Sequence, residues 1–395
     1  MNVRKLYYFV RRGFPGSRAN HIQSAMMCDA FRSVGVDTTV VAPMETGEST
    51  EQVAERFGLR APLDTVVLAH PPAIANWTPV RDWIIRRALH SFVGGLNGIR
   101  GQTVLYGRTS RNYPMAQLLD RSRSPEGEKV VCEVHDAEMS DAWVRRLARA
   151  DSLIVISRAL RDWMIERGID GERVLVAPDG VDLRRYDSLR FKGVTDLRTE
   201  LGLPADRPLV GYTGSLNGDR GTETLVRAVR HFPPEAFLVI AGGRKADSDA
   251  LRRIARAEGV EGRVIFVGHR PHAEVAAFQM AMNTLVMAYT PDLATQRWCS
   301  PLKMFEYMAS GRPIVTSDIP ALHEILKHEE NALFVPPGNT AALGGAIARL
   351  LGDSSLARTL SERALNDVRQ YSWDERARRI LEFALVGFPS QGLPV

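Results

Sequence analysis

The stretch CSPLKMFEYMASGRPIVTSD, residues 299–318, reads as a polar turn, one compact helix and a strand. Ser300 suits the N-cap, Pro301 suits the first helical position, and Gly311 suits the C-terminal stop. A helix followed at once by an apolar strand is the repeating unit of a parallel sheet covered by helices. The stretch therefore predicts one unit of an α/β fold.

The same alternation runs outward from this stretch in both directions. We expect strands at 5–10, 37–43, 64–69, 103–107, 129–135, 152–157, 173–178, 209–214, 236–243, 263–268, 283–289 and 313–318, with helices between them. This pattern predicts two Rossmann-like doubly wound domains, 1–185 and 186–374, and a helix in 375–395 that crosses back to the first domain. Two such domains facing each other create a cleft, and ligands bind these sheets at the carboxyl ends of strands.

The bulk composition narrows the function classes. The chain has 395 residues, 45% of them apolar and 25% charged, which is ordinary for a folded globular protein. No apolar run approaches the ~18 residues of a spanning helix, and the first apolar run is too short for a signal-peptide core. The three cysteines show no CxxC spacing, so we expect reduced thiols and a cytoplasmic protein. The net charge of +5 is spread over both halves, which argues against duplex nucleic acid as a partner.

The helix start in 299–306 carries the features of an anion site. The free N–H groups of Leu302 and Lys303 would lie at a helix N-terminus, whose dipole favours an anion. Lys303 adds a full positive charge there, and Glu306 shares its face and could accept hydrogen bonds from two ribose hydroxyls. The alternative is a capped helix with an ordinary Lys–Glu surface pair.

Two glycine-containing loops are further phosphate candidates. In VGYTGSLNGDRGTETLVRAV, residues 210–229, a strand runs into Gly214 and a loop that holds Gly218, Arg220 and Gly221, ahead of a helix for which Thr222 suits the cap. Glycines let the backbone approach a phosphate, and Arg220 could reach it. Such loops also arise as plain turns.

The first loop, RRGFPGSRANHI, has the same form. Gly16 and Ser17 could lie against a diphosphate, with Asn20 and His21 opening the next helix. The alternative is a strand–helix turn with a lone surface histidine.

Polar residues also gather where strands of the first half end. Glu133, His135 and Asp136 end one strand and Arg108 ends another, so these side chains would face the same edge of the sheet. His135 could orient a sugar hydroxyl. The alternative is a structural histidine paired with a carboxylate.

Two further segments have weaker functional interpretations. The DSD at 247–249 resembles a metal-binding DxD, but Asp is favoured at a helix start as cap and dipole partner, so we expect no metal. The helix in 81–96 is basic on one side and apolar on the other, at Ile85, Leu89, Phe92, Val93 and Leu96. It could contact the inner face of a membrane peripherally, or pack its apolar face on a core.

Taken together, these motifs resemble the retaining glycosyltransferases of family 4, which have the GT-B fold. VGYTGSLNGDRG is similar to the strand and loop of that family, VAPDGVD to its hinge stretch, RVIFVGH to its nucleotide-side loop, and FEYMASGRPIVTSD to its E-A-M-A-x-G-x-P-V-V block. The resemblance covers about residues 174–340 well and the first half more loosely.

The resemblance implies a metal-independent hexosyltransferase of polysaccharide or glycoconjugate biosynthesis, with a UDP- or GDP-sugar as donor and a carbohydrate, lipid-linked or small-molecule acceptor. The implied donor-binding residues are Gly16, Ser17, Gly214, Ser215, Arg220, Arg270, Ser300, Pro301, Leu302, Lys303 and Glu306. The implied acceptor-side or donor-sugar residues are Asn20, His21, Arg108, Glu133, His135 and Trp298. Arg220, Lys303 and His135 would have catalytic roles, and the leaving phosphate would take the acceptor's proton.

Two departures from the family pattern affect these expectations. Trp298 stands where the family has its first Glu, eight positions before Glu306, and Ser215 stands where it has a loop arginine. Lys303 would replace the lost phosphate charge. The alternatives are a nucleotide-sugar epimerase on the same scaffold and a catalytically silent nucleotide-sugar-binding subunit. A dinucleotide oxidoreductase is disfavoured because no strand is followed by GxGxxG and a later acidic residue.

Overall fold

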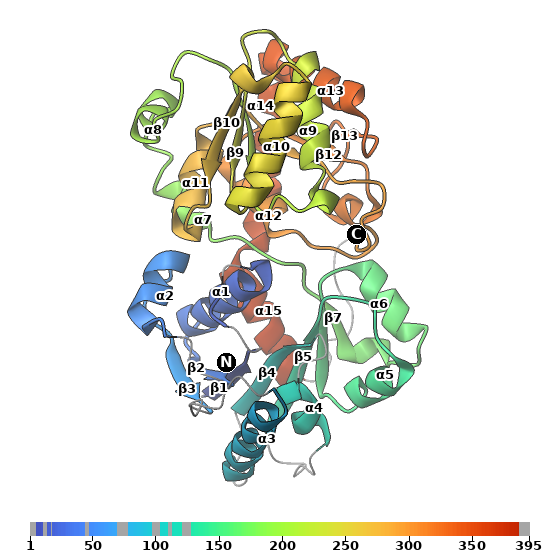
Figure 1. Cartoon of the computed structure of the whole chain (residues 1–395). Helices are drawn as coiled ribbons and strands as arrows, with labels where there is room; N and C mark the ends of the chain where they lie inside the picture. Colours follow the sequence, from blue (N-terminus) through green and yellow to red (C-terminus); the bar gives the residue numbers. More distant parts are fainter. Residues whose placement is uncertain are drawn as a thin grey trace. The chain divides into compact units, whose positions relative to one another are not determined.

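The computed structural model describes residues 5–10, 14–16, 18–43, 47–68, 78–96, 103–109, 113–120 and 128–386. The chain divides into two compact units (Figure 1). The first unit comprises Met1–Asp179 and Trp373–Val395, and the second comprises Gly180–Ser372. These bounds differ by a few residues from the expected ranges 1–185, 186–374 and 375–395.

The first unit is built on a parallel sheet. In the part of the chain that the structure describes, seven strands follow the order β3-β2-β1-β4-β5-β6-β7. The strands are β1 (Lys5–Phe9), β2 (Asp37–Ala42), β3 (Asp64–Val67), β4 (Thr103–Thr109), β5 (Lys129–Val134), β6 (Ser152–Val155) and β7 (Val174–Val176). Its helices are α1 (Ala19–Ser33), α2 (Thr50–Phe57), α3 (Thr78–Gly95), α4 (Tyr113–Asp120), α5 (Asp141–Leu147), α6 (Arg158–Ile165) and α15 (Trp373–Val386), with a short 3₁₀ turn η1 (Gly171–Arg173).

The second unit is a second parallel sheet with its own helices. Six strands follow the order β10-β9-β8-β11-β12-β13 within the described residues. They are β8 (Leu209–Thr213), β9 (Phe237–Ala241), β10 (Val264–Gly268), β11 (Thr284–Met287), β12 (Ile314–Ser317) and β13 (Leu333–Val335). The helices are α7 (Leu183–Asp187), α8 (Val194–Glu200), α9 (Thr222–Ala228), α10 (Lys245–Ala257), α11 (His272–Met280), α12 (Leu302–Ser310), α13 (Thr340–Gly352) and α14 (Ser354–Asp367). The short 3₁₀ turns are η2 (Gly218–Arg220), η3 (Val229–His231), η4 (Glu261–Arg263), η5 (Pro320–Glu324) and η6 (Val368–Tyr371).

Helices cover both faces of the second sheet, as Figure 1 shows for α10 on one side and α12 on the other. Alternate residues of the strands enter two separate apolar clusters: Leu209, Val239 and Leu285 join one, and Val210 and Val286 join the other. A sheet buried on both faces needs near-continuous apolar strands, which is why these segments read as apolar runs in the sequence. The expected doubly wound α/β architecture is confirmed.

The apolar side of α3 lies in the core of the first unit. Ile85, Leu89, Val93 and Leu96 are buried, and the ring of Phe92 packs edge-on against the β1 ring of Tyr7 at 5.7 Å. These contacts match the core-packing alternative for 81–96, because the apolar side chains that would enter a lipid surface are covered by protein. Within the described residues, no helix is both long and apolar enough to span a bilayer.

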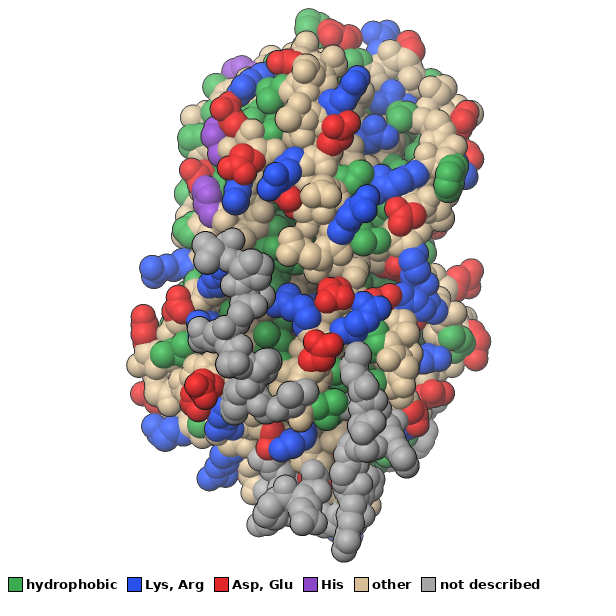
Figure 2. Space-filling view, turned by 180° about the vertical axis from the view of Figure 1, so that it is seen from behind, with side chains coloured by type: hydrophobic (Ala, Val, Ile, Leu, Met, Phe, Trp, Pro, Cys, Tyr) green, Lys and Arg blue, Asp and Glu red, His purple; other side chains and the backbone are tan. Residues whose placement is uncertain are grey.

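Charged side chains of both signs share the surface. On the face seen in Figure 2, Lys and Arg lie interspersed with Asp and Glu. That face therefore carries no uniform basic field of the kind that binds a phosphate backbone.

Candidate functional site

The loop after β8 packs against the backbone at the end of β9, at the carboxyl edge of the second sheet. The N–H of Gly214 donates to the carbonyl of Ala241 at 2.9 Å, and a Cβ on Gly242 would overlap the carbonyl of Gly214. The hydroxyl of Tyr212 donates to the carbonyl of Ser215 at 2.6 Å and holds the exposed loop residues Gly214 and Ser215 in place. This packing needs small residues, and it leaves a backbone edge that a ligand can approach.

Lys303, in the first turn of α12, projects into this loop. Its Nζ lies 4.0 Å from the centre of the Tyr212 ring and 3.1 Å from the point where a Cβ on Gly214 would be. Among the described residues, no carboxylate lies within ion-pair distance of that ammonium. Burial and the charge of Arg220 lower the pKa of Lys303 to about 7, although Glu306 and Asp219 act in the opposite direction. The site therefore holds a partly buried cation without an anionic partner.

Arg220 supplies a second cation beside Lys303. It ends the 3₁₀ turn η2, with its guanidinium 5.8 Å from the centre of the Tyr289 ring and its Nε 3.6 Å from Asp219. Lys303 and Arg220 repel each other. An anion bound beside them would relieve this repulsion and would therefore bind more strongly.

The helix start differs from the expected one by one residue. Pro301, not Ser300, is the N-cap residue of α12, it makes no side-chain cap bond, and Ser300 is buried. Proline lacks an N–H and fits this flanking position with an extended ψ of 127°. The positions of Leu302 and Lys303 in the first turn are as expected, and Gly311 ends the helix with φ at 66°.

Glu306 lies one turn further along α12, and both of its carboxylate oxygens are engaged. His272 Nε2 lies 2.8 Å from Oε1, and Gln279 Nε2 donates to Oε2 at 3.1 Å. Burial opposes ionisation of Glu306, but hydrogen bonds from His272 and Gln279 and the charge of Arg185 outweigh it and lower the pKa. Glu306 is therefore ionised, and its carboxylate contacts His272 and Gln279. This differs from the alternative, in which Glu306 forms an ordinary surface pair with Lys303.

Two expected donor-side residues show no interaction with this cluster. Arg270, which precedes α11, is exposed, with its Nη1 3.9 Å from Glu274 of that helix. Trp298 donates its backbone N–H to Thr295, while its indole Nε1 is buried without a hydrogen-bond partner.

In the first unit, the residues at the end of β5 form a buried network. Glu133 is fully buried and accepts hydrogen bonds from Gln23 at 2.7 Å, from Arg376 Nη2 at 2.8 Å and from the hydroxyl of Tyr106. Burial alone would raise the pKa of Glu133, but the charge of Arg376 and hydrogen bonds from His135 and Arg376 lower it. The expectation that Glu133 contacts a sugar is corrected, because its carboxylate has no exposed surface.

His135 belongs to the same network. Its Nε2 lies 2.6 Å from Glu133 Oε1, and burial together with the charge of Arg108 lowers its pKa to about 4. His135 is therefore neutral near pH 7 and donates to Glu133, which matches the structural alternative given above. Arg108 is half-buried, with Nη1 3.4 Å from the side-chain oxygen of Gln23.

The donor atoms of Glu133, His135 and Asp179 lie within 4.8 Å of one another, as the ligands of a metal ion do. Arg376 already occupies the position of the cation in this cluster, and burial raises the pKa of Asp179 to about 7 despite that arginine. The group is a protein ion-pair network rather than a fitted metal site. At the DSD motif, Asp247 pairs with the guanidinium of Arg244 at 2.9 Å.

The described residues of the first loop have contacts of their own. The carbonyl of Gly16 accepts from Arg56 at 3.5 Å, Asn20 lies in the first turn of α1, and His21 packs its ring on Phe14 at 6.0 Å. Ser17 lies outside the described residues.

Comparison with known proteins identifies the fold and family. A family profile described as "Glycosyltransferase Family 4" matches residues 24–185, and one described as "Glycosyl transferases group 1" matches residues 207–353. The chain belongs to the glycosyltransferases of family 4.

Curated relatives of this family 4 chain include the D-inositol 3-phosphate glycosyltransferases of Xylanimonas cellulosilytica and Nocardia farcinica. They are 27% and 29% identical to it over 60% of its length. The chain spans little more than half of these relatives, 57% and 52% of their lengths.

Solved structures share the fold of the chain. Anabaena HepE, in complex with UDP and glucose, covers 96% of this chain and 98% of its own, with a TM-score of 0.70 and 19% identity. Sucrose-phosphate synthase of Thermosynechococcus elongatus has a TM-score of 0.72 and 21% identity over the same shares. The expected GT-B fold is confirmed.

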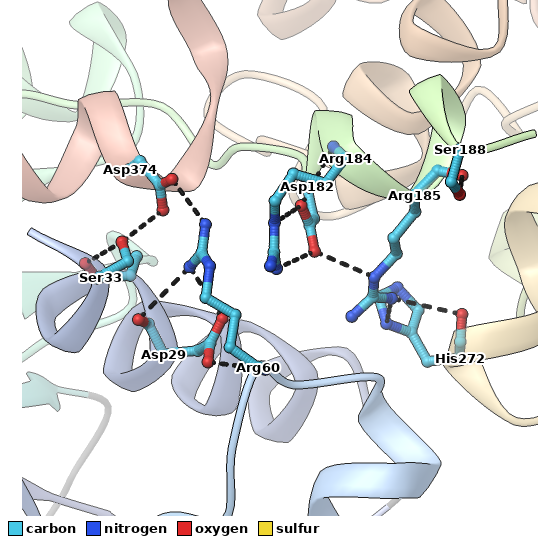
Figure 3. A network of polar contacts seen from close by, with 10 residues as sticks. Asp29, Ser33, Arg60, Asp182, Arg184, Arg185, Ser188, His272 and Asp374 are labelled. Atoms are coloured by element: carbon cyan, nitrogen blue, oxygen red, sulfur yellow. Dashed lines mark hydrogen bonds and ion pairs between the residues drawn. The ribbon is translucent and has the colours of Figure 1, made fainter. Parts of the chain in front are cut away.

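Sequence reasoning missed several members of these networks in the family 4 chain, among them Arg376, His272 and Arg185. Arg376 reaches Glu133 from α15, and His272 contacts Glu306. Arg185 contacts His272 in turn (Figure 3). A weak signal existed for Arg185, because the GVDLRRYD stretch places two arginines after an N-capping Asp182. No spacing rule predicted the other two contacts.

Proposed function

We propose that the chain transfers a hexosyl group from a nucleotide-diphosphate sugar, UDP- or GDP-linked, to a carbohydrate, lipid-linked or small-molecule acceptor, with retention of configuration and without a metal ion. The observation that carries the proposal is the Lys303 ammonium, partly buried beside Gly214 without a carboxylate partner. A diphosphate there would give this cation its missing anion. Solved neighbours of the same fold in complex with UDP support the choice of ligand class.

The reaction breaks the bond between the anomeric carbon and a diphosphate oxygen, and negative charge develops on that oxygen. Groups that meet this charge more strongly in the transition state than in the ground state accelerate the step. Lys303 and Arg220 are the two cations beside the loop, and the N-terminus of α12 adds a dipole of the same sign. We assign them this role.

Proton transfer follows from the same arrangement. The acceptor oxygen bonds to the anomeric carbon on the face that the phosphate leaves, and the departing phosphate oxygen takes the acceptor's proton. This route requires no carboxylate base, which agrees with Glu133 being buried in an ion pair. Glu306 would accept hydrogen bonds from the ribose hydroxyls.

The curated relatives suggest one further acceptor class. The names of the curated relatives refer to D-inositol 3-phosphate, a small phosphorylated polyol. We therefore include phosphorylated polyols among the acceptors to test, beside free sugars and lipid-linked sugars.

A direct test combines binding with product analysis. UDP-, GDP-, ADP- and dTDP-sugars are screened by thermal shift, and stabilising donors are incubated with an acceptor panel in EDTA. We expect transfer in EDTA, with the anomeric configuration of the donor retained in the product by NMR. Donor isomerisation without acceptor would indicate an epimerase, and binding without transfer or hydrolysis would indicate a silent subunit; either contradicts the proposal.

Arg220→Ala tests the charge assignment. Turnover should fall by roughly 10²-fold or more if Arg220 meets the developing charge. Arg227→Ala is the matched control, since Arg227 is a nearby exposed arginine of α9 that pairs with Glu258 at 2.7 Å. A change under threefold in the Arg220 variant would remove it from the mechanism.

A further inference from the structure

Both carboxylate oxygens of Glu306 are hydrogen-bonded, one to His272 and the other to Gln279. Each of these two side chains is bonded in turn to another residue. Gln279 donates to Oε2 and to Thr213 Oγ1 at 3.0 Å, while its own oxygen accepts from the hydroxyl of Tyr186. His272 contacts Oε1 at 2.8 Å. The carboxylate plane is therefore set by two side chains rather than by Glu306 alone.

Arg185 fixes the tautomer of His272. Arg185 Nη1 lies 2.8 Å from His272 Nδ1, and a guanidinium can only donate. Nδ1 must then be the acceptor, so the ring proton lies on Nε2, which donates to Glu306. Arg185 is itself fixed, because its Nε donates to Asp182 Oδ2 at 3.2 Å (Figure 3). All of these side chains are largely buried, with 13% exposure for Arg185 and 14% for His272.

We propose that Arg185 and His272 are positioning residues that fix the orientation in which the Glu306 carboxylate meets the ribose of a nucleotide donor. This rests on the proposed function, which places the ribose at Glu306. The structure supplies the relay Asp182–Arg185–His272–Glu306, whose members lie on α7, α11 and α12 or immediately before α7. The relay makes the second unit selective for ribonucleotides over 2′-deoxyribonucleotides.

The lone-pair count of the carboxylate explains the selectivity. An ionised carboxyl has about four acceptor positions, and His272 and Gln279 use two of them. The remaining two suit the vicinal hydroxyls of a ribose. A carboxylate free to rotate would meet one hydroxyl at a time, whereas a fixed one meets both without a further loss of side-chain entropy.

The experiment is a double-mutant cycle in which one change is made in the protein and the other in the ligand. The dissociation constants of UDP and 2′-deoxy-UDP are measured by calorimetry for the full chain and for His272→Leu. We expect the unmodified chain to prefer UDP by about tenfold or more, the size of one hydrogen bond to a charged group. His272→Leu should lose this preference by weakening UDP alone, with the 2′-deoxy-UDP constant unchanged within about twofold.

This cycle separates positioning from general damage. A variant that is merely misfolded weakens both nucleotides alike, and that result would overturn the inference. His272→Gln provides the rescue, since its amide can accept from Arg185 and donate to Glu306, and it should restore the preference. Loss of the preference in both variants would equally count against the relay.

The two adjacent arginines of α7 provide the matched control. Arg184 also pairs with Asp182, at 2.7 Å, but Arg185 is the one that contacts His272. Arg185→Met should reduce the preference for UDP, and Arg184→Met should leave it within about twofold. Equal effects of the two changes would overturn the assignment to Arg185.

The Glu306→Gln variant separates two hypotheses: the positioning role of Arg185 and His272, and the contact between Glu306 and the ribose. If Glu306→Gln removes the preference while His272→Leu keeps it, the relay is wrong and the proposed ribose contact stands. If the Glu306→Gln variant keeps the preference for UDP over 2′-deoxy-UDP, Glu306 does not contact the ribose, and the proposed role of the relay is wrong as well. Absence of both binding and transfer with the UDP and GDP donors would contradict the proposed function.

Discussion

At the scale of single residues, Lys303 is the most informative side chain of the second unit. It lies against an aromatic face, and partial burial and the neighbouring Arg220 lower its pKa to about 7 from the ordinary 10.5. A bound diphosphate would stabilise the charged form and raise that pKa again. Ligand binding and protonation of Lys303 are then linked.

We therefore predict proton uptake when UDP binds at pH 8. The free chain holds Lys303 mostly neutral at that pH, and the complex holds it mostly charged, so up to about one proton is taken from the buffer. Calorimetry in two buffers of different ionisation enthalpy measures this number. Lys303→Met should abolish the uptake and weaken binding. Uptake that persists in Lys303→Met would assign the proton to another group.

The residues of the candidate site were unevenly predictable. Lys303 and Glu306 stood out because a helix start with a cation and an acid one turn on is a local pattern. The cap was wrong by one position, since Ser and Pro both suit a helix start and the sequence does not decide which lies outside. His272 and Arg185 escaped because their contacts join α11, α7 and α12, and local spacing carries no information on such packing.

At the scale of elements, the turn between β8 and α9 depends on one glycine. Gly221 has a φ of 61°, and a Cβ there would overlap the backbone of Ala288. The expected cap at Thr222 is wrong for this reason: Gly221 takes the N-cap position and lets the chain turn tightly.

Gly221→Ala should destabilise the chain by more than about 1 kcal/mol, because it adds left-handed strain to a backbone clash. Gly218→Ala, with nothing within 4 Å of its Cβ position, should change stability by less than about 0.5 kcal/mol. Urea denaturation of both variants gives the comparison. Equal midpoints for the two variants would show that the loop relaxes around the added methyl group.

The attachment of α15 to the first unit rests on a buried ion pair. Arg376, 3% exposed, donates to Glu133 and also to the carbonyls of Ala177 and Pro178, at 3.0 and 2.8 Å. In the first turn of α15, the carboxylate of Asp374 accepts hydrogen bonds from Arg60 at 2.6 Å and from Ser33 of α1 at 2.8 Å (Figure 3).

Arg376→Met should cost about 3–5 kcal/mol at pH 8, because it removes the positive charge that compensates the buried carboxylate of Glu133. In the unmodified chain the pKa of Glu133 is lowered, so its contribution to stability is present above about pH 4.5 and is lost as the pH falls. The cost of Arg376→Met should therefore shrink in acid. Denaturation at pH 8 and pH 4 measures both values.

Two further variants control this result. Arg378→Met breaks an exposed pair with Glu375 and should cost less than about 1 kcal/mol. Adding Glu133→Gln to Arg376→Met should recover part of the loss. A cost for Arg376→Met that does not depend on pH would mean that packing, not charge, explains it.

Most strands were predictable because both faces of each sheet are buried and the strands read as apolar runs. β13 was missed, since it is a three-residue edge strand, LFV, that stops at Pro336. The pair of Glu133 and Arg376 was equally hidden, because 243 positions separate the two residues.

At the scale of the whole molecule, the second unit is continuous in sequence and the first is not. Gly180–Ser372 contains both apolar clusters of its sheet, so we expect this fragment to fold alone and to bind UDP. Residues 1–179 lack α15 and with it Arg376, the cation that pairs with Glu133, and we expect them not to fold.

Joining 1–179 to 373–395 through a short glycine–serine linker should restore folding, since Arg376 already contacts the carbonyl of Pro178. Cooperative unfolding by circular dichroism and NMR dispersion distinguish the three fragments. A stable fold for 1–179 without α15 would show that the buried ion pair is dispensable.

The position of α15 has a consequence for biosynthesis. During translation the seven strands of the first unit leave the ribosome long before Trp373–Val386 does, and the second unit is synthesised in between. Domains usually fold as they emerge, N-terminal first. We expect the reverse order here: the later unit completes first, and the earlier one completes only when Arg376 is made and can pair with Glu133. During that interval we expect the nascent chain to be most exposed to aggregation and most dependent on chaperones.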